Sequence, residues 1–258
     1  MSLNFLIVRQ PYILAHRGAS GYAPENTFEA FDRSIAMRSD GIETDIRATK
    51  DGTLVLMHDA RVDRTTTGEG LVSELLAEDV ARLDAGGGFN PRYSSERVPL
   101  LSAFLAKYGR RLPLCLEIKQ PGIESAVLEA VRNQDLLFGP APTDVGGAET
   151  MALPFVTFSS FHFDSCVAIK KIAPDAVVGF LTPDFDDITI ARVAKAKLDQ
   201  ICPRADTCTP AQVATARDRN LGIRAWGVAD REVLRSAMKC GIDGITCNWP
   251  DWTVGPTR

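Results

Sequence analysis

The sequence predicts an α/β fold, a (β/α)8 TIM barrel with a small insertion after its second strand. The chain has 258 residues, a length that is typical of one such barrel. Short apolar runs of strand type alternate with amphipathic helical runs nearly from end to end, and eight runs of strand type can be counted, the number that closes the barrel. An open, doubly wound sheet is the alternative, but no strand is followed by the glycine fingerprint of a dinucleotide site.

The expected strands are short and rich in β-branched and apolar residues. They cover Tyr12–Ala15, Gly41–Ile46, Leu114–Lys119, Phe155–Ser159, Val177–Leu181, Gln200–Cys202, Ile223–Val228 and Gly244–Cys247. The expected helices carry apolar residues at helical spacing. They cover Thr27–Met37, Leu101–Tyr108, Ile123–Gln134, Phe163–Ile172, Asp186–Ala196, Pro210–Asn220 and Arg231–Cys240. After the eighth strand we expect a very short last helix or none.

Residues 59–99 break this alternation. Asp51-Gly52 predicts a hairpin turn that leads into an extra strand, Leu54–His58. The stretch that follows is too long for an ordinary loop, so we expect an insertion at the C-terminal mouth, where barrel enzymes keep their sites. A second loop, Gly139–Pro154, follows a helix and precedes a strand, which places it at the opposite face. We expect residues 1–258 to form one domain.

Composition excludes several classes of partner. The net charge of -4 and the pI of about 5.5 provide no basic field for nucleic acid. No apolar run approaches the roughly 20 residues of a membrane span, so we expect no stable membrane insertion. The first ten residues lack the basic start and the cleavage site of a signal peptide. The six cysteines are scattered and form no metal motif, which favours reduced thiols in a cytoplasmic protein.

Two acids stand on one face of the second expected strand. Side chains of a strand alternate between faces, so Glu43 and Asp45 point the same way, and in a barrel that way is inward. Buried acids repel each other and lose hydration unless something positive sits between them. Glu117 repeats the pattern on the third strand, with Lys119 on the same face. Three converging carboxylates predict a divalent cation, and oxygen ligands favour Mg²⁺ or Ca²⁺ over Zn²⁺.

Other polar side chains fall at the ends of expected strands. His16 and Arg17 follow the first strand, and His58 ends the extra strand. Arg17 and Lys119 are cations that suit a phosphate group. An imidazole titrates near neutral pH, so two of them can act as a base and an acid. A metal, a phosphate clamp and paired imidazoles together predict phosphodiester cleavage.

Each of these side chains also has a structural interpretation. His16 taken alone is more often a capped or core histidine, and Glu117 with Lys119 could equally form an ion pair inside the barrel. Trp226, which follows Arg224 on one face of the seventh strand, is more often a core residue than a ligand platform. Because all of these side chains lie at the same end of successive strands, a functional interpretation is favoured over a structural one.

The start of the first helix has its own structural explanation. Asn26 with Glu29 three residues later predicts a capping box, which explains both residues without catalysis. Glu25 has no explanation of that kind. His162 begins a helix and is expected to be incidental.

An ordered set of motifs runs through the chain. It consists of His16-Arg17-Gly18, Pro24-Glu25-Asn26-Thr27, Glu43-x-Asp45, Asp51-Gly52, His58-Asp59, Arg64-Thr65-Thr66 and Glu117-Ile118-Lys119. With these motifs the chain resembles the glycerophosphodiester phosphodiesterase family from about His16 to about Pro250. The resemblance implies a TIM barrel that hydrolyses glycerophosphodiesters to an alcohol and sn-glycerol 3-phosphate, with Mg²⁺ or Ca²⁺.

The resemblance also implies roles for individual residues. The expected metal ligands are Glu43, Asp45 and Glu117. The expected catalytic pair is His16 and His58. The expected substrate contacts are Arg17 and Lys119 at the phosphate and Trp226 as a wall of the glycerol pocket. The family's usual Trp-Thr-Val-Asn is here Trp226-Gly227-Val228-Ala229, and its common Thr-Asp before the last proline is here Thr246-Cys247-Asn248-Trp249-Pro250. These departures concern substrate preference rather than the reaction.

Two other functions are compatible with the same residues. One is a related metal-dependent phospholipase of C or D type, which would need an apolar rim at the mouth. The other is a catalytically silent protein that binds phosphate esters. The sequence leaves open the headgroup alcohol, the choice of metal, the oligomeric state and which histidine is the base.

Overall fold

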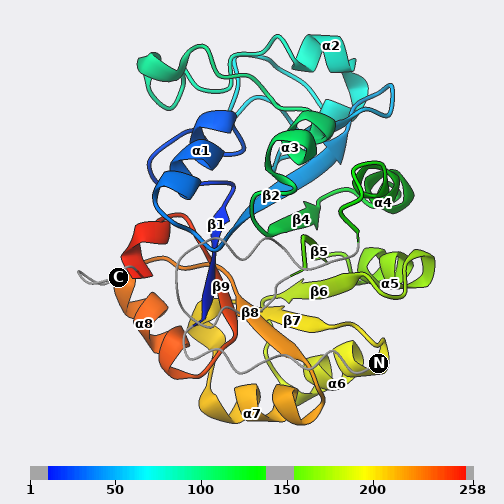
Figure 1. Ribbon diagram of the computed structural model, residues 1–258, viewed down its shortest axis with the longest axis vertical. Helices are drawn as coiled ribbons and strands as arrows, with labels where there is room; N and C mark the ends of the chain where they lie inside the picture. The colour runs from blue at the N-terminus through cyan, green and yellow to red at the C-terminus, as the bar shows by residue number, and fades with distance from the viewer. Residues whose placement is uncertain (1–10, 138–153, 254–258) are drawn as a thin grey trace.

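A closed parallel barrel forms the centre of the molecule (Figure 1). The computed structural model describes residues 11–137 and 154–253, and within them eight parallel strands follow one another around the barrel. They are β1 (Tyr12–His16), β2 (Gly41–Ala48), β4 (Leu114–Ile118), β5 (Val156–Ser160), β6 (Val177–Thr182), β7 (Gln200–Pro203), β8 (Gly222–Ala225) and β9 (Gly244–Cys247). Because β1 pairs with both β2 and β9, the sheet closes, and the predicted TIM barrel is confirmed.

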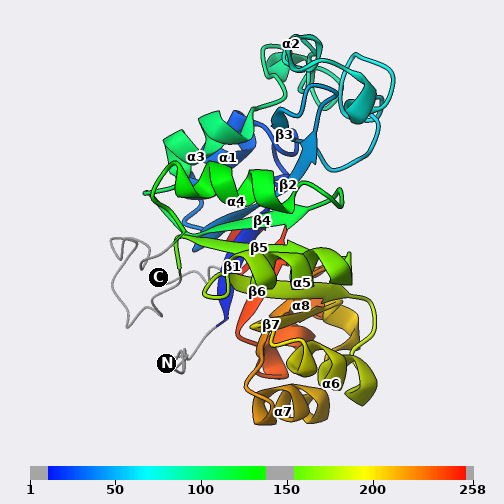
Figure 2. The same ribbon diagram turned by 90° about the vertical axis from the view of Figure 1, so that its right-hand side faces the viewer.

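Helices cover the outside of the barrel between successive strands (Figure 2). They are α1 (Phe28–Ala36), α3 (Leu101–Tyr108), α4 (Glu124–Arg132), α5 (Phe163–Ile172), α6 (Asp187–Lys195), α7 (Pro210–Asp218) and α8 (Arg231–Lys239). Several begin at a side chain that accepts a hydrogen bond from the first turn: Thr27, Asp186, Thr209 and Asp230. After β9 the described chain forms one short 3-10 turn, Pro250–Thr253, as expected.

The strand alternation divides the interior into two regions. Residues that point outward from the barrel, such as Ile42, Ile46 and Leu116, join the helices in one large apolar cluster. Residues that point inward are more polar and include Glu43 and Asp45, both buried. The core between sheet and helices therefore stabilises the fold, while the inner face carries the charged groups.

The predicted hairpin and insertion are present. β3 (Leu54–Leu56) pairs antiparallel with β2 after a turn at Gly52, whose φ of +79° favours glycine. The short helix α2 (Ala77–Val80) lies in the insertion, which extends beyond the end of β2, on the opposite side of the molecule from α6 and α7 (Figure 2). The insertion has its own small core against β3, formed by Val55, Met57, Val62, Val72, Val80, Ala85 and Val98.

Several predicted boundaries differ from the structure. The seventh barrel strand was expected over Ile223–Val228 but ends at Ala225, because Gly227 adopts a φ of +74° that an extended strand cannot contain. Lys119 lies just after β4 rather than within it. Helix ends differ by at most two residues, which is usual where terminal turns fray. The loop Gly139–Pro154, except Pro154, and the first ten residues lie outside the described residues. Among the described helices, none is long and apolar enough to cross a membrane.

Candidate active site

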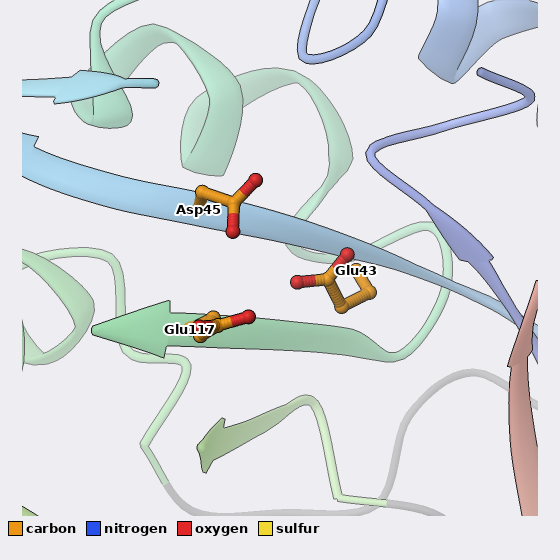
Figure 3. A group of neighbouring side chains, drawn as sticks. All are labelled: Glu43, Asp45 and Glu117. Atoms are coloured by element: carbon orange, nitrogen blue, oxygen red, sulfur yellow. The ribbon is translucent and has the colours of Figure 1, made fainter. Parts of the chain in front are cut away.

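Three carboxylates meet on the inner face of two neighbouring strands (Figure 3). The register of β2 and β4 pairs Asp45 with Glu117, and Glu43 lies two residues earlier on β2, on the same face. One oxygen from each carboxylate lies within 4.8 Å of the others. The strand register thus brings together the three acids predicted from the sequence.

The free oxygens of this group fit a divalent cation. Glu43 Oε1 and Asp45 Oδ1 are buried and have no hydrogen-bond partner among the described residues. A buried carboxylate oxygen without a partner is costly, and a cation is the partner that three such groups share most readily. Since all the donors are oxygens, the site suits Mg²⁺ or Ca²⁺.

Two cationic side chains adjoin the carboxylates. Arg17 Nε lies 3.1 Å from Asp45 Oδ2, and Lys119 Nζ donates to Glu117 Oε1 at 2.6 Å and lies 3.8 Å from Asp45 Oδ1. Arg17 also turns its backbone N–H toward Glu43 Oε2, at 3.1 Å, because its φ of +55° bends the chain immediately after β1. The ion pair of Glu117 and Lys119 therefore exists, and it lies inside the proposed site.

These charges alter the pKa values of the acids in different directions. Burial and the neighbouring Asp45 raise the pKa of Glu43 well above its ordinary value, and the same two causes raise the pKa of Glu117 to about 7. Burial acts on Asp45 too, but Arg17 and Lys119 bring its pKa below the ordinary value. Repulsion between carboxylates is what a bound cation would relieve.

His16 reaches the cavity from the end of β1. Its Nδ1 lies 2.5 Å from Asn248 Oδ1, an amide oxygen that can only accept, so the proton is on Nδ1 and Nε2 carries the free lone pair. Nε2 lies 3.9 Å from Glu43 Oε2. Burial and the adjacent Arg17 lower the pKa of His16 to about 4, which keeps the ring neutral.

His58 reaches the same cavity from beyond the end of β3. Its Nδ1 lies 2.6 Å from Asp59 Oδ1, so here a carboxylate holds the Nδ1 proton. Burial lowers the pKa of His58, although Asp45 and Asp59 oppose this effect. Both histidines therefore present Nε2 for proton transfer, and each ring is 30% exposed.

A cavity of about 270 Å³ opens between these groups. It is lined by His16, Arg17, Glu43, His58, Glu117, Lys119, Ser159, Phe161, Leu181, Arg224, Trp226, Gly227, Val228, Thr246 and Asn248. Asp45 lies behind the lining, with 0% exposure. Of the residues predicted from the sequence, seven thus line one cavity and the eighth supports them from below.

The wall opposite the carboxylates is aromatic. Trp226 donates its indole N–H to the carbonyl of Cys202, at 3.0 Å, and packs edge-on against Phe161, with ring centroids 4.9 Å apart. This hydrogen bond to the backbone fixes the indole ring, and the residue lines the cavity. Trp226 is therefore part of the cavity wall rather than of the outer core.

The predicted capping box of α1 is wrong. Thr27 is the N-cap, and its Oγ1 accepts from Ala30 N at 3.3 Å, while Glu29 pairs with Arg33 on the helix surface. Asn26 has a φ of +57° and turns inward, where its Nδ2 donates to Asp45 Oδ2 at 2.9 Å. Asn26 therefore orients a carboxylate of the site instead of capping the helix.

Eight lining residues were not predicted as part of the site, and Asn248 and Arg224 among them make side-chain hydrogen bonds there. Asn248 follows β9 and holds His16, and the sequence marked it only as a departure from a familiar motif. Arg224 on β8 is fully buried and donates to Thr246 Oγ1 at 2.6 Å. Its strand position, two residues before Trp226 on the same face, was the available signal.

Comparisons with known proteins agree with this geometry. The model of the glycerophosphoryl diester phosphodiesterase family matches residues 16–252. A glycerophosphodiester phosphodiesterase of Caldanaerobacter subterraneus subsp. tengcongensis is 31% identical over 95% of this chain and 97% of its own. The crystal structure of a glycerophosphodiester phosphodiesterase from Agrobacterium tumefaciens is 28% identical, has a TM-score of 0.78, and covers 94% of this chain and 98% of its own.

A more distant structure has the same fold. A phosphodiesterase of Oleispira antarctica, solved with the product sn-glycerol-3-phosphate, is 24% identical with a TM-score of 0.80 over 94% of both chains. The match of the family model covers nearly the whole barrel, including every predicted site residue. The chain therefore belongs to the glycerophosphoryl diester phosphodiesterase family.

Proposed function

We propose that the cavity at the barrel mouth hydrolyses glycerophosphodiesters to an alcohol and sn-glycerol 3-phosphate, with the residues of the site acting as follows. The observation that carries this proposal is that two imidazoles, each held at Nδ1, line one cavity beside a cluster of three carboxylates, two of which have buried oxygens without a hydrogen-bond partner. Family membership supports the same reaction.

Glu43, Asp45 and Glu117 would hold a divalent cation, Mg²⁺ or Ca²⁺. When bound, such a cation neutralises phosphate charge and lowers the pKa of a coordinated hydroxyl group. Asn26 and the backbone N–H of Arg17 orient Asp45 and Glu43 for this task through their hydrogen bonds.

The two histidines would divide the proton transfers. His16, which is held neutral, takes at Nε2 the proton of an attacking water molecule, whose oxygen forms a bond to phosphorus while the bond from phosphorus to the alcohol oxygen breaks. His58, with a carboxylate behind its ring, would enter the reaction protonated on both nitrogens; it donates the Nε2 proton to the oxygen of the departing alcohol and keeps the Nδ1 proton on Asp59. A negative charge behind an imidazole stabilises its protonated form, so His58 is better suited to be the acid.

The cationic and aromatic side chains would bind the substrate. Arg17 and Lys119 line the cavity next to the carboxylates and contact the phosphate, where they stabilise the charge that develops during hydrolysis. Trp226 forms the wall against which the glycerol carbons lie. Gly227, where the family commonly has threonine, leaves this wall without a hydroxyl group.

The proposal is tested by incubating the protein with glycerophosphocholine and metal and measuring the rate at which glycerol 3-phosphate is released. Phospholipid vesicles are the parallel substrate, because faster turnover on them would favour the phospholipase. A phospholipase would need an apolar rim at the mouth. Leu76 and Phe89 of the insertion are 41% and 51% exposed, but neither lines the cavity. Binding without product in either assay would instead indicate a silent binding protein and contradict the proposal.

We also extend the proposal to the setting of the reaction. Residues 1–258 would act as one catalytic domain, because the insertion at 59–99 follows directly after His58, which lines the cavity, and its Asp59 holds the His58 ring. All six cysteines are free, which supports a reducing, cytoplasmic compartment.

A further inference from the structure

A continuous series of charged side chains runs from His58 to Arg17. Behind the His58 ring, Asp59 accepts from Arg64 Nε through its second oxygen, at 2.5 Å. The two terminal nitrogens of Arg64 then donate to both oxygens of Glu25, at 2.7 and 2.8 Å. Glu25 Oε1 also accepts from Arg17 Nη1, at 2.9 Å. Neither Arg64 nor Glu25 lines the cavity or has a role in the proposed chemistry.

His58 depends on this series for its orientation. The residue follows β3 in a loop, so no strand fixes its side chain, and its backbone carbonyl is held by Arg47 Nε at 2.9 Å. Among the described residues, Asp59 is the partner of the ring itself. Asp59 is half-buried and adjacent in sequence, so its carboxylate can turn unless a third group holds it.

Arg64 supplies that third group in a defined geometry. Its two terminal nitrogens form parallel hydrogen bonds with Glu25, which fix the guanidinium more firmly than one contact does, and its Nε then donates a single hydrogen bond to Asp59. Hydrogen bonding by Arg64 lowers the pKa of Asp59 to about 2, so that Asp59 remains ionised whenever His58 needs its partner. Glu25 joins Arg64, from the insertion, to Arg17, from the end of β1.

We propose that Arg64 and Glu25 are positioning residues: they lock Asp59, and through Asp59 they fix the tautomer and orientation of the His58 ring. This inference rests on the proposed role of His58 as the acid. The insertion thereby supports the site from outside the cavity, because its Arg64 holds Asp59, the partner of the His58 ring. Arg64 is 49% exposed, and an exposed ion pair alone contributes little to stability. A merely structural role would therefore leave turnover unchanged.

The experiment compares Arg64→Met with Arg61→Met. Arg61 lies in the same insertion and forms an ion pair with Asp63, at 2.9 Å, which does not reach the cavity. We expect Arg64→Met to lower kcat by about tenfold or more, the effect of losing one charge-assisted hydrogen bond. KM should stay nearly unchanged, and Arg61→Met should behave as the wild type. Arg64→Lys should recover part of kcat, because it keeps the charge without the fork.

A second measurement is independent of activity. The chain has three histidines, so ¹⁵N NMR of the imidazole nitrogens, assigned by His58→Ala, can follow each ring in metal-free protein. His58 should be a fixed Nδ1–H tautomer in the wild type and a mixture in Arg64→Met. The double variant Asp59→Asn/Arg64→Met should be no slower than Asp59→Asn, because both changes act through one ring.

The outcomes separate this inference from the proposed function. Wild-type kcat in Arg64→Met overturns the inference, and so does an unchanged His58 tautomer or additive losses in the double variant. None of these results would alter the role of His58, which His58→Ala tests directly. If His58→Ala itself keeps full turnover, the proposed function fails first, and the tautomer measurement still decides whether Arg64 orients the ring.

Discussion

His16 and His58 face one cavity, but different parts of the molecule supply and support them. His16 ends β1, and its Nδ1 rests on the neutral amide of Asn248 after β9, so the barrel itself holds it. His58 follows β3, and its Nδ1 rests on the ionised Asp59, which Arg64 holds from the insertion. The ring tautomers agree, and the charge behind the rings differs.

This difference separates the two tasks of a hydrolase within one fold. A neutral amide fixes the orientation of His16 without stabilising its protonated form. This suits a general base, whose Nε2 must be unprotonated before the reaction. A carboxylate behind His58 favours the protonated ring, which suits an acid. The barrel strands alone supply one kind of support, and the insertion adds the other.

We expect the largest loss of activity when either imidazole ring is removed. His16→Ala and His58→Ala should each lower kcat by about 10²–10⁴-fold, the usual contribution of one proton-transfer group. His162→Ala is the control, because His162 stands at the start of α5 and does not line the cavity. Steady-state kinetics with metal in excess, together with melting temperatures, measure the effect. Near wild-type turnover in either variant would remove that histidine from the mechanism.

The support of His58 is the next test. Asp59→Asn replaces a charge-assisted hydrogen bond, worth about 1.5–3 kcal/mol, and we expect kcat to fall by about 10- to 150-fold. Asn can also donate to Nδ1 and so stabilise the opposite tautomer. The kinetics of Asp63→Asn, on the exposed neighbouring ion pair, provide the matched control. Equal rates for the two variants would show that the charge behind His58 has no role.

Metal affinity tests the side of the cavity nearer His16. Glu43→Gln removes one charged ligand while it keeps the shape of the side chain, and we expect the metal concentration for half-maximal activity to rise by about 10–100-fold. Calorimetric titration of Mg²⁺ and Ca²⁺ into both proteins measures the affinity directly and ranks the two metals. Glu29→Gln, on the surface of α1, is the control. Unchanged affinity in Glu43→Gln would exclude Glu43 as a ligand.

The same contrast explains what the sequence could predict. Strand alternation and the βα rhythm depend on local patterns, so the barrel and the placement of Glu43, Asp45 and Glu117 on its inner face could be predicted. The positions of His16 and His58 could be predicted as well, because each lies at or just after the end of a strand.

The supporting groups could not be predicted in the same way. Asn248 meets His16 across 232 positions of sequence, and Glu25 meets Arg64 across 39, so no local pattern reports either contact. The role of Asn26 was predicted wrongly, because its spacing to Glu29 fits a capping box while its side chain donates to Asp45. Long-range polar contacts decide the site, and only the closed barrel brings them together.

Asn248→Ala should have the smallest effect. It removes one neutral hydrogen bond from His16, worth about 0.5–1.5 kcal/mol, so we expect kcat to fall by about 2- to 12-fold, less than in Asp59→Asn. ¹⁵N NMR should show the His16 ring losing its fixed Nδ1–H tautomer, while the His58 signals stay unchanged. A loss as large as that of Asp59→Asn would mean that both rings need equally strong support. The barrel side and the insertion side would then differ in origin but not in function, and the division into base and acid would need another cause.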